Sequence, residues 1–186
     1  MKLLANFVGY QLVWFCAVIG AGRGLAWPGV TAAAVFVLAQ WVMSDQRSAD
    51  ARLVAVALLA GLLIDGVLAV SGLAAYAAPW PSPSFAPAWI LALWCSFAMT
   101  LTHTMRFLHD RIALSAAFGA IGGPLAYLGA ARGWGAVEFA EPRWQGLLWL
   151  ALAWGLVMPL LAQLAQRWIR GAEPTQDSQA QARALP

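Results

Sequence analysis

Apolar residues fall into six long runs along the chain, and short polar stretches separate these runs. A helix that crosses the ~30 Å hydrocarbon core of a bilayer needs about 20 such residues. The pattern predicts an all-α fold, a six-helix transmembrane bundle, as one domain over residues 1–168. The six spans are expected at about residues 3–21, 25–43, 53–72, 87–105, 112–131 and 144–166. Residues 169–186 are polar and are expected to form a disordered cytoplasmic tail.

Composition supports a membrane protein, because 62% of the 186 residues are hydrophobic and only 10% are charged. Soluble domains carry about 25% charged residues. The net charge is +3, but the basic residues stand singly at the ends of the apolar runs. This pattern orients a protein in a membrane and does not form a basic groove. We therefore expect membrane lipids as partners and no nucleic acid.

The basic residues also predict which way the bundle faces. Six spans place both termini on one side, together with Lys2, Arg47, Arg52, Arg106, Arg111, Arg167, Arg170 and Arg183. The opposite side carries only Arg23, Arg132 and Arg143. Since cytoplasmic loops are enriched in Lys and Arg, both termini are expected in the cytoplasm.

The first apolar run has some features of a cleaved signal peptide, namely Lys2 at its start and small residues at its end. Its apolar stretch is interrupted by Asn6 and Gln11, and its positive region is a single lysine. We expect a retained helix.

One carboxylate follows the most apolar stretch of the chain. Every residue from Leu53 to Ile64 is apolar or glycine, and Asp65 comes next. At a rise of ~1.5 Å per residue, Asp65 lies roughly 18 Å from the cytoplasmic start of its span. A carboxylate near the bilayer centre costs ~2.5–3.5 kcal/mol on insertion scales and usually faces the bundle interior.

Several side chains on other spans lie at the depth of Asp65 or within a turn of it. We expect a polar, aromatic-lined pocket in the outer half of the bundle, formed by Gln11, Trp14, Asp65, Trp94, Ser96, Pro124, Tyr127 and Trp154. Indole and phenol groups donate hydrogen bonds that a carboxylate accepts. Three interpretations of Asp65 stay open. It is a structural acid that ties its span to Trp14, Trp94 or Tyr127, a general acid or base, or the group of a transporter that binds a proton or a cationic substrate.

A second polar layer is expected nearer the cytoplasmic end, with Asn6, Thr100, His103 and Arg106 as members. The span that carries His103 runs inward, which places His103 more than about ten angstroms from Asp65 in depth. We therefore expect no catalytic pair between these two residues. Polar side chains that pack near the headgroups are the simpler explanation of the layer.

Residues 112–131 combine small residues with a proline. Ser115, Gly119 and Gly123 recur every four residues, which favours close helix packing. Pro124 is expected to kink the helix. The kinked segment is then a hinge, part of a cavity wall or part of a tightly packed face.

Two arginines lie in similar segments, GAGRG at 20–24 and GAARG at 129–133. Both segments lie at the outer ends of spans, so Arg23 and Arg132 are expected at the outer surface. There they cap helix C-termini or contact a lipid phosphate.

The order of polar, aromatic and glycine positions resembles a family of small bacterial inner-membrane proteins, domain of unknown function 2878. The matching positions are Asn6, Gln11, Trp14, Gly61, Asp65, Trp89, Trp94, Phe97, Thr100, Leu101 and the segment GAIGGPLAYLGA from Gly119 to Ala130. The similarity covers roughly residues 3–165. It implies a bacterial inner (cytoplasmic) membrane. Genes of this family often lie near genes for fatty-acid or lipid modification, which implies a link to lipid chemistry, while no catalytic residue is carried over.

The sequence contains no H-E-x-x-H, no G-x-S-x-G and no nucleotide-binding glycine loop, and its two histidines are too few for a membrane di-iron site. No metal and no cofactor are therefore expected. Three functions stay open. The protein is an enzyme or accessory subunit of membrane lipid or fatty-acid modification, with lipid-modifying enzymes as partners; a small proton- or solute-coupled transporter; or a membrane scaffold without catalysis. A homo-oligomer fits each of them.

Overall fold

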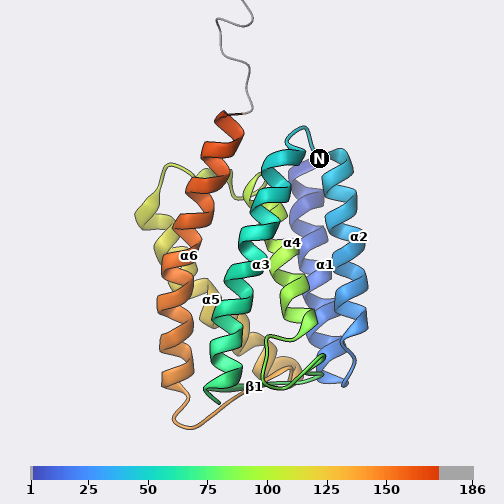
Figure 1. Cartoon of the computed structure of the whole chain (residues 1–186), viewed down its shortest axis with the longest axis vertical. Helices are drawn as coiled ribbons and strands as arrows, with labels where there is room; N and C mark the ends of the chain where they lie inside the picture. Colours follow the sequence, from blue (N-terminus) through green and yellow to red (C-terminus); the bar gives the residue numbers. More distant parts are fainter. Residues whose placement is uncertain (1, 172–186) are drawn as a thin grey trace, which may run out of the picture.

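A computed structural model describes residues 2–171 of the chain, which form six α-helices and one small sheet (Figure 1). The helices are α1 (Lys2–Gly22), α2 (Trp27–Met43), α3 (Arg47–Val70), α4 (Ala88–Leu101), α5 (Ile112–Trp134) and α6 (Trp144–Arg170). Each of the six predicted runs corresponds to one helix. The tail predicted for residues 169–186 begins inside α6, and the part beyond Gly171 lies outside the described residues.

Four of the helices are long and apolar enough to cross a membrane: Leu3–Gly22, Arg47–Val70, Ile112–Trp134 and Trp144–Arg170. The other two, α2 with 17 residues and α4 with 14, are apolar but shorter. By length and hydropathy, then, four of the six expected spans meet the requirement for a transmembrane helix.

The ends of two helices differ from the predicted boundaries. Helix α3 begins at Arg47, before the apolar run, and takes Asp50 into its first turn, where a carboxylate is favoured by the helix dipole. Helix α4 ends at Leu101 and not near residue 105. Turns and a short 3₁₀-helix, η1 (Arg106–Leu108), follow it. The Arg106 side chain donates to the Thr102 carbonyl, which would accept from the backbone N–H of residue 106 if the helix continued.

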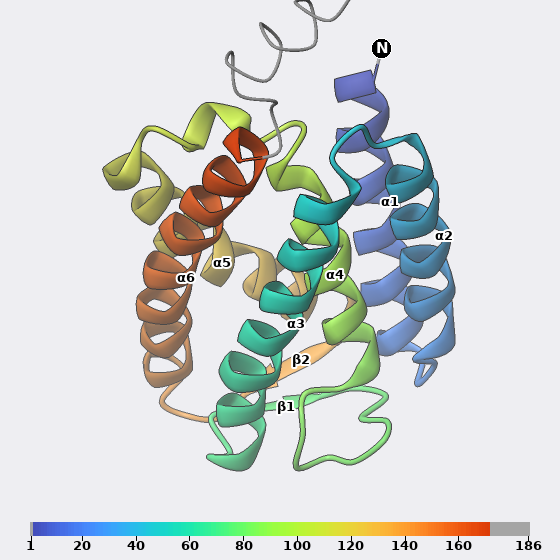
Figure 2. The same cartoon turned by 45° about the horizontal axis from the view of Figure 1, so that its top comes forward.

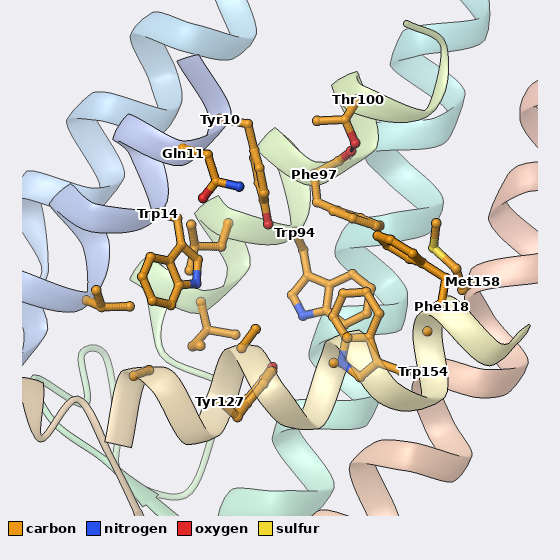
Figure 3. A pocket seen from close by; sticks show the side chains of 18 of the residues that line it. Tyr10, Gln11, Trp14, Trp94, Phe97, Thr100, Phe118, Tyr127, Trp154 and Met158 are labelled. Carbon is orange, nitrogen blue, oxygen red and sulfur yellow. Dashed lines mark hydrogen bonds between the residues drawn. The ribbon is translucent and has the colours of Figure 1, made fainter. Parts of the chain in front are cut away.

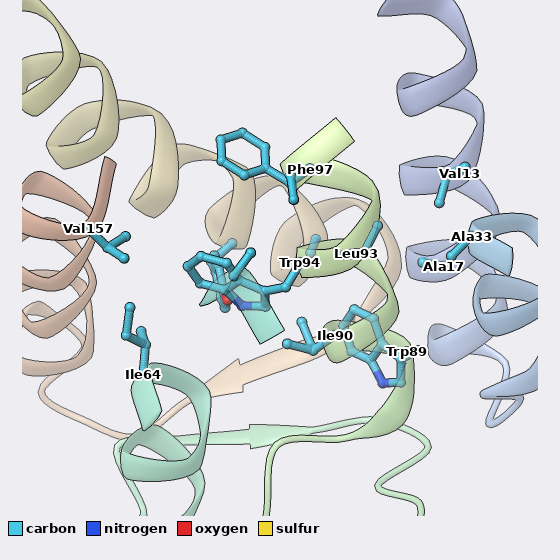
Figure 4. Close-up of a cluster of buried hydrophobic side chains, with 14 of the residues drawn as sticks. Val13, Ala17, Ala33, Ile64, Trp89, Ile90, Leu93, Trp94, Phe97 and Val157 are labelled. Atoms are coloured by element: carbon cyan, nitrogen blue, oxygen red, sulfur yellow. The ribbon is translucent and has the colours of Figure 1, made fainter. Parts of the chain in front are cut away.

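Helix α4 occupies the middle of the bundle, in contact with α1, α2, α3 and α6 (Figure 2). Its buried side chains Trp89, Leu93, Trp94 and Phe97 form the centre of the apolar core. Figure 4 shows them between residues of α1 and α2 on one side and of α3 and α6 on the other. Although α4 is short, little of its surface is left to contact lipid, because the surrounding helices cover it.

The outer surface of the bundle is apolar, while several polar side chains are buried inside. Leu63, Val35 and Leu156 are among the large exposed hydrophobic residues, and they come from three different helices. Asn6 and Asp65 have no exposed surface at all. Extended exposed apolar surface of this kind marks contact with a membrane or a partner.

Helices α5 and α6 pack along each other through the small-residue face of α5. A Cβ atom at Gly123 would overlap the Trp154 ring, and one at Gly119 would overlap the Trp154 backbone. Ser115, one turn earlier, is fully buried. The structure confirms that these positions serve close helix packing. Helix α5 continues through Pro124 to Trp134.

A feature absent from the predicted fold is a two-stranded antiparallel sheet, formed by β1 (Ala74–Tyr76) and β2 (Val137–Phe139). Ala75 pairs with Glu138, so the segment after α3 is joined to the segment after α5. Figure 1 shows β1 at the end of the bundle opposite to the start of α1 and the end of α6. Three-residue strands are too short to leave a recognisable alternation in the sequence.

Candidate functional site

The centre of the site is Asp65, which has no exposed surface and accepts hydrogen bonds from three side chains. Trp94 Nε1 donates to Oδ2 at 2.7 Å, and the Tyr76 hydroxyl donates to Oδ1 at 2.7 Å. The Tyr127 hydroxyl also donates to Oδ1. An ionised carboxylate is an acceptor with about four lone-pair positions, so three convergent donors suit it. One side chain of α3 thereby connects β1, α4 and α5.

Glycine on α3 makes this arrangement sterically possible. A Cβ atom at Gly61, one turn before Asp65, would overlap the Trp94 indole ring. The other face of that ring is stacked on Trp154 of α6, with ring centroids 4.3 Å apart and an interplanar angle of 15°. Trp149 Nε1, also from α6, donates to the Ile64 carbonyl at 3.0 Å. Trp94 is therefore held between α3 and α6 with its N–H aimed at the carboxylate.

Tyr76 contributes from the sheet, outside the helices. Burial raises the pKa of its phenol well above the ordinary value of 10.0, and the nearby Asp65 carboxylate raises it further. Tyr76 therefore keeps its proton at neutral pH and remains a hydrogen-bond donor to Asp65.

A cavity of about 270 Å³ lies beside Asp65, among α1, α4, α5 and α6 (Figure 3). Its walls are mainly aromatic and aliphatic, and Tyr127 and Trp94 stand in them. Asp65 itself is not among the lining residues. It lies behind these two side chains and holds both by hydrogen bonds. Trp94 and Tyr127 thus connect the buried carboxylate to the cavity wall.

The mouth of the cavity lies between α1 and α5. These helices meet at their C-terminal ends, where the Trp134 ring packs edge-on against Trp14 and Phe15, with centroids 5.5 Å apart in both pairs. Further from that end, lining residues reach the surface: Phe7 of α1 is 51% exposed and Phe118 of α5 is 42% exposed. The cavity therefore opens sideways, through a face whose exposed side chains are apolar.

The structure brings together part of the predicted pocket. Gln11, Trp14, Trp94, Tyr127 and Trp154 line the cavity. Three predicted members do not. Asp65 is behind the wall, Pro124 is half-buried in α5, and Ser96 is fully buried with its hydroxyl bonded to the Ala92 carbonyl at 2.9 Å. Sequence position gives depth along a span but not the side of the helix that faces the cavity.

Of the three alternative partners predicted for Asp65, Trp94 and Tyr127 donate to it, and a further donor was missed. Trp14 is not among the donors to Asp65; the third donor is Tyr76. One indication of Tyr76 was present in the sequence, because this residue lies just beyond the end of the span that carries Asp65. The strand that turns its hydroxyl inward depends on pairing with β2.

The inner polar layer forms a hydrogen-bonded network at the other end of the bundle. Asn6 Nδ2 donates to Gln40 Oε1 at 3.0 Å and to the Met99 carbonyl at 3.2 Å. Asn6 Oδ1 accepts from the Thr104 hydroxyl at 2.7 Å. The fully buried amide of Asn6 is satisfied in this way, and it joins α1 to α2 and to the end of α4.

Of the other predicted members of that layer, the side chains of Thr100 and Arg106 bond elsewhere, while His103 contacts the Met99 carbonyl that also accepts from Asn6. The Thr100 hydroxyl donates to the Phe97 carbonyl at 2.7 Å, and Arg106 Nη2 donates to Gln46 Oε1 at 3.0 Å. His103 Nδ1 lies 3.1 Å from the Met99 carbonyl.

A second buried carboxylate, Asp50, belongs to the inner layer and was missed by the sequence reasoning. It has no exposed surface, and its Oδ1 accepts from the Thr102 hydroxyl at 2.6 Å. Its Oδ2 has no hydrogen-bond partner among residues 2–171. The predicted span began at Leu53, which left Asp50 outside the bundle. The earlier start of α3 places it inside.

Arg23 and Arg132 are both exposed. Arg132 lies in the last turn of α5, where a cation is favoured by the helix dipole, and Arg23 follows the end of α1. A lipid phosphate at either residue stays a prediction. Within residues 2–171, no three His, Cys, Asp or Glu side chains are grouped so that they could hold a metal ion.

Long apolar helices, an apolar exterior and a buried polar site with a sideways opening together define a multi-helix membrane protein. Residues 3–160 match the family model described as Protein of unknown function (DUF2878), and the chain belongs to this family. Neither a curated protein nor a solved structure matches the chain.

Proposed function

We propose that this protein crosses the bacterial inner membrane six times and binds a lipid in the cavity between α1 and α5. In this role it serves membrane lipid or fatty-acid modification, as an enzyme or as an accessory subunit. The observation that carries the proposal is the position of the cavity mouth. A lipid can enter between Phe7 and Phe118 directly from the bilayer, without passing through water.

The distribution of basic residues supports a topology with six spans and both termini in the cytoplasm. Arg47, Arg106, Arg111 and Arg167 belong to the end of the bundle that holds the start of α1 and the end of α6. Arg132 and Arg143 belong to the end that holds the sheet. The end richer in arginine is expected in the cytoplasm. The short helices α2 and α4 are apolar enough to cross with the others in a locally thinned bilayer.

Tyr127 is the residue best placed to act on a bound lipid. Its side chain lines the cavity, and its hydroxyl is bonded to Asp65, which can accept its proton or orient it. In the enzyme form of the proposal, Tyr127 is the catalytic residue and Asp65 is a positioning residue. In the accessory form, the same pair shapes the cavity for a partner enzyme.

The test is a comparative lipid profile by mass spectrometry, in a strain that lacks the gene and in strains that carry wild type or variants at matched protein levels. Gly122→Leu fills the cavity, because the nearest atom to a Cβ at Gly122 is 4.0 Å away, on Phe118. Gly133→Leu is the matched control, since it lies on the same helix, is exposed and has nothing within 4 Å.

We expect deletion to change the lipid species, and Gly133→Leu but not Gly122→Leu to restore them. Tyr127→Phe keeps the cavity wall and removes the hydroxyl. A failure of Tyr127→Phe to restore the profile favours catalysis, and restoration favours the accessory role. Indistinguishable profiles in the deletion and wild-type strains would reject the lipid proposal in favour of transport or scaffolding.

A further inference from the structure

The cavity contains polar groups that the protein itself leaves without partners. Tyr10, Gln11 and Trp14 follow one another on a single face of α1 and line the cavity. Figure 3 shows all three side chains directed toward the space in front of Trp94 and Tyr127. Among residues 2–171, none of these three polar groups has a side-chain hydrogen-bond partner, in contrast to Trp94 and Tyr127.

A fourth donor faces them from α6. Trp154 Nε1 is buried in the wall near the Tyr127 hydroxyl, but within the described part of the chain no acceptor, this hydroxyl included, meets hydrogen-bonding geometry with it. A buried N–H without an acceptor costs free energy that a bound acceptor recovers. Indole groups only donate, and a phenol and an amide can also donate, so the cavity offers mainly hydrogen-bond donors. The complementary ligand group is an oxygen that accepts.

The ligand group is also uncharged. No Lys, Arg, His, Asp or Glu is among the cavity-lining residues of the described chain. A phosphate, carboxylate or ammonium at this depth would be buried without a counter-charge, which is far more costly than burial of a neutral carbonyl.

Apolar residues line the cavity on both sides of these donors. Phe7 lies one turn before Tyr10 on α1, and Val18 lies one turn after Trp14. The hydroxyls of Thr100 and Thr104, also in the wall, donate to the Phe97 carbonyl and to Asn6. The unpartnered donors are thus near the middle of α1, with carbon-lined space toward either end.

We infer that the cavity selects an uncharged lipid whose carbonyl oxygen is flanked by hydrocarbon on both sides, as in a long-chain ester, and that Tyr10, Gln11, Trp14 and Trp154 recognise this oxygen. This rests on the proposed function, because it names the chemical class of the lipid. It adds a recognition role for α1 that is independent of Asp65.

The test measures binding by native mass spectrometry of the full chain in dodecyl maltoside, with three probes that share sixteen carbons. Octyl octanoate has a central ester, hexadecane has no acceptor, and hexadecyl phosphate carries a charge. Octyl octanoate is expected to bind about tenfold more tightly than either other probe, the effect of one or two hydrogen bonds. The double variant Tyr10→Phe with Gln11→Leu is expected to abolish most of this preference and to leave hexadecane binding unchanged.

Gln145→Leu, an exposed position outside the cavity, is the control and is expected to keep the preference. Unchanged hexadecane binding also shows that the double variant is folded. Equal binding of ester and hydrocarbon, tighter binding of the phosphate, or an unchanged preference in the double variant would overturn the inference and leave the lipid-binding proposal intact. Binding of none of the probes by wild type would overturn both.

Discussion

Trp94 and Asp65 are joined by a hydrogen bond of 2.7 Å that runs from the central helix α4 to α3 inside an apolar core. The indole reaches the carboxylate because Gly61 leaves room for the ring on the surface of α3. Stacking on Trp154 holds the ring in this orientation. This contact links a buried acid to the wall of the cavity.

Gly61→Ala is expected to destabilise the protein by about 1–3 kcal/mol, since the new methyl group must displace the Trp94 indole and weaken its bond to Asp65. The free energy of unfolding in mixed dodecyl maltoside and SDS micelles measures this. Gly66→Ala, on the same helix with nothing within 4 Å, is the control. It should be neutral or gain up to about 1 kcal/mol from helix propensity. Equal effects of the two changes would contradict the packing role of Gly61.

Asp65→Asn is expected to cost about 1–3 kcal/mol in the same assay. Tyr76 and Tyr127 both donate to Oδ1, and Trp94 donates to Oδ2. An asparagine presents one oxygen and one NH₂ group, so in either orientation at least one donor loses its acceptor. Asp45→Asn, an exposed change of the same kind, should have almost no effect. A similar cost at both positions would argue against the three-donor arrangement.

Asp50→Asn is expected to change the free energy of unfolding by less than about 1 kcal/mol, less than Asp65→Asn, because the lost interaction with the helix dipole offsets the gain from removing a buried carboxylate. The amide oxygen can still accept from Thr102, and the substitution removes a buried charge whose Oδ2 has no partner in the described chain. The same unfolding assay compares the two variants directly. A loss as large as that of Asp65→Asn would mean that Oδ2 of Asp50 has an essential interaction.

Stability is expected to fall as the pH is lowered below about 6.5, and His109 is one cause. Burial lowers the pKa of His109 below the ordinary 6.5, and Arg106 and Arg170 also act in that direction. The Leu101 carbonyl, 2.8 Å from Nε2, and Asp110 act against it. The unfolded chain therefore binds a proton at a higher pH than the folded protein, so the neutral side chain stabilises the fold above pH 6.5 and loses this effect in acid.

Melting temperatures at pH 7.5 and pH 5.5 test the role of His109. His109→Gln keeps an N–H donor for the Leu101 carbonyl and does not titrate. We expect its melting temperature to fall less between the two pH values than that of wild type. An identical fall in both proteins would assign the pH dependence to other groups.

Much of this fold was predictable, because hydrophobicity along a membrane helix is a property of nearly every residue in it. The six runs correspond to the six helices, and the small residues Gly119 and Gly123 do pack against α6. The start of α3 was not predictable from hydropathy, since residues 47–52, four of which are polar or charged, form helix too. The early end of α4 depends on side-chain bonds to backbone carbonyls, which hydropathy does not register.

Sequence alone predicted the relative depth of polar residues within an apolar run, because a helix rises by a constant ~1.5 Å per residue. That is why Trp94 and Tyr127 were expected near Asp65, and why His103 was placed in another layer. Depth is one coordinate, however, and the direction in which a side chain leaves its helix depends on how the helices are rotated and packed. Tertiary structure therefore decided that Tyr76 and not Trp14 bonds to Asp65, and that the carboxylate lies behind the cavity wall.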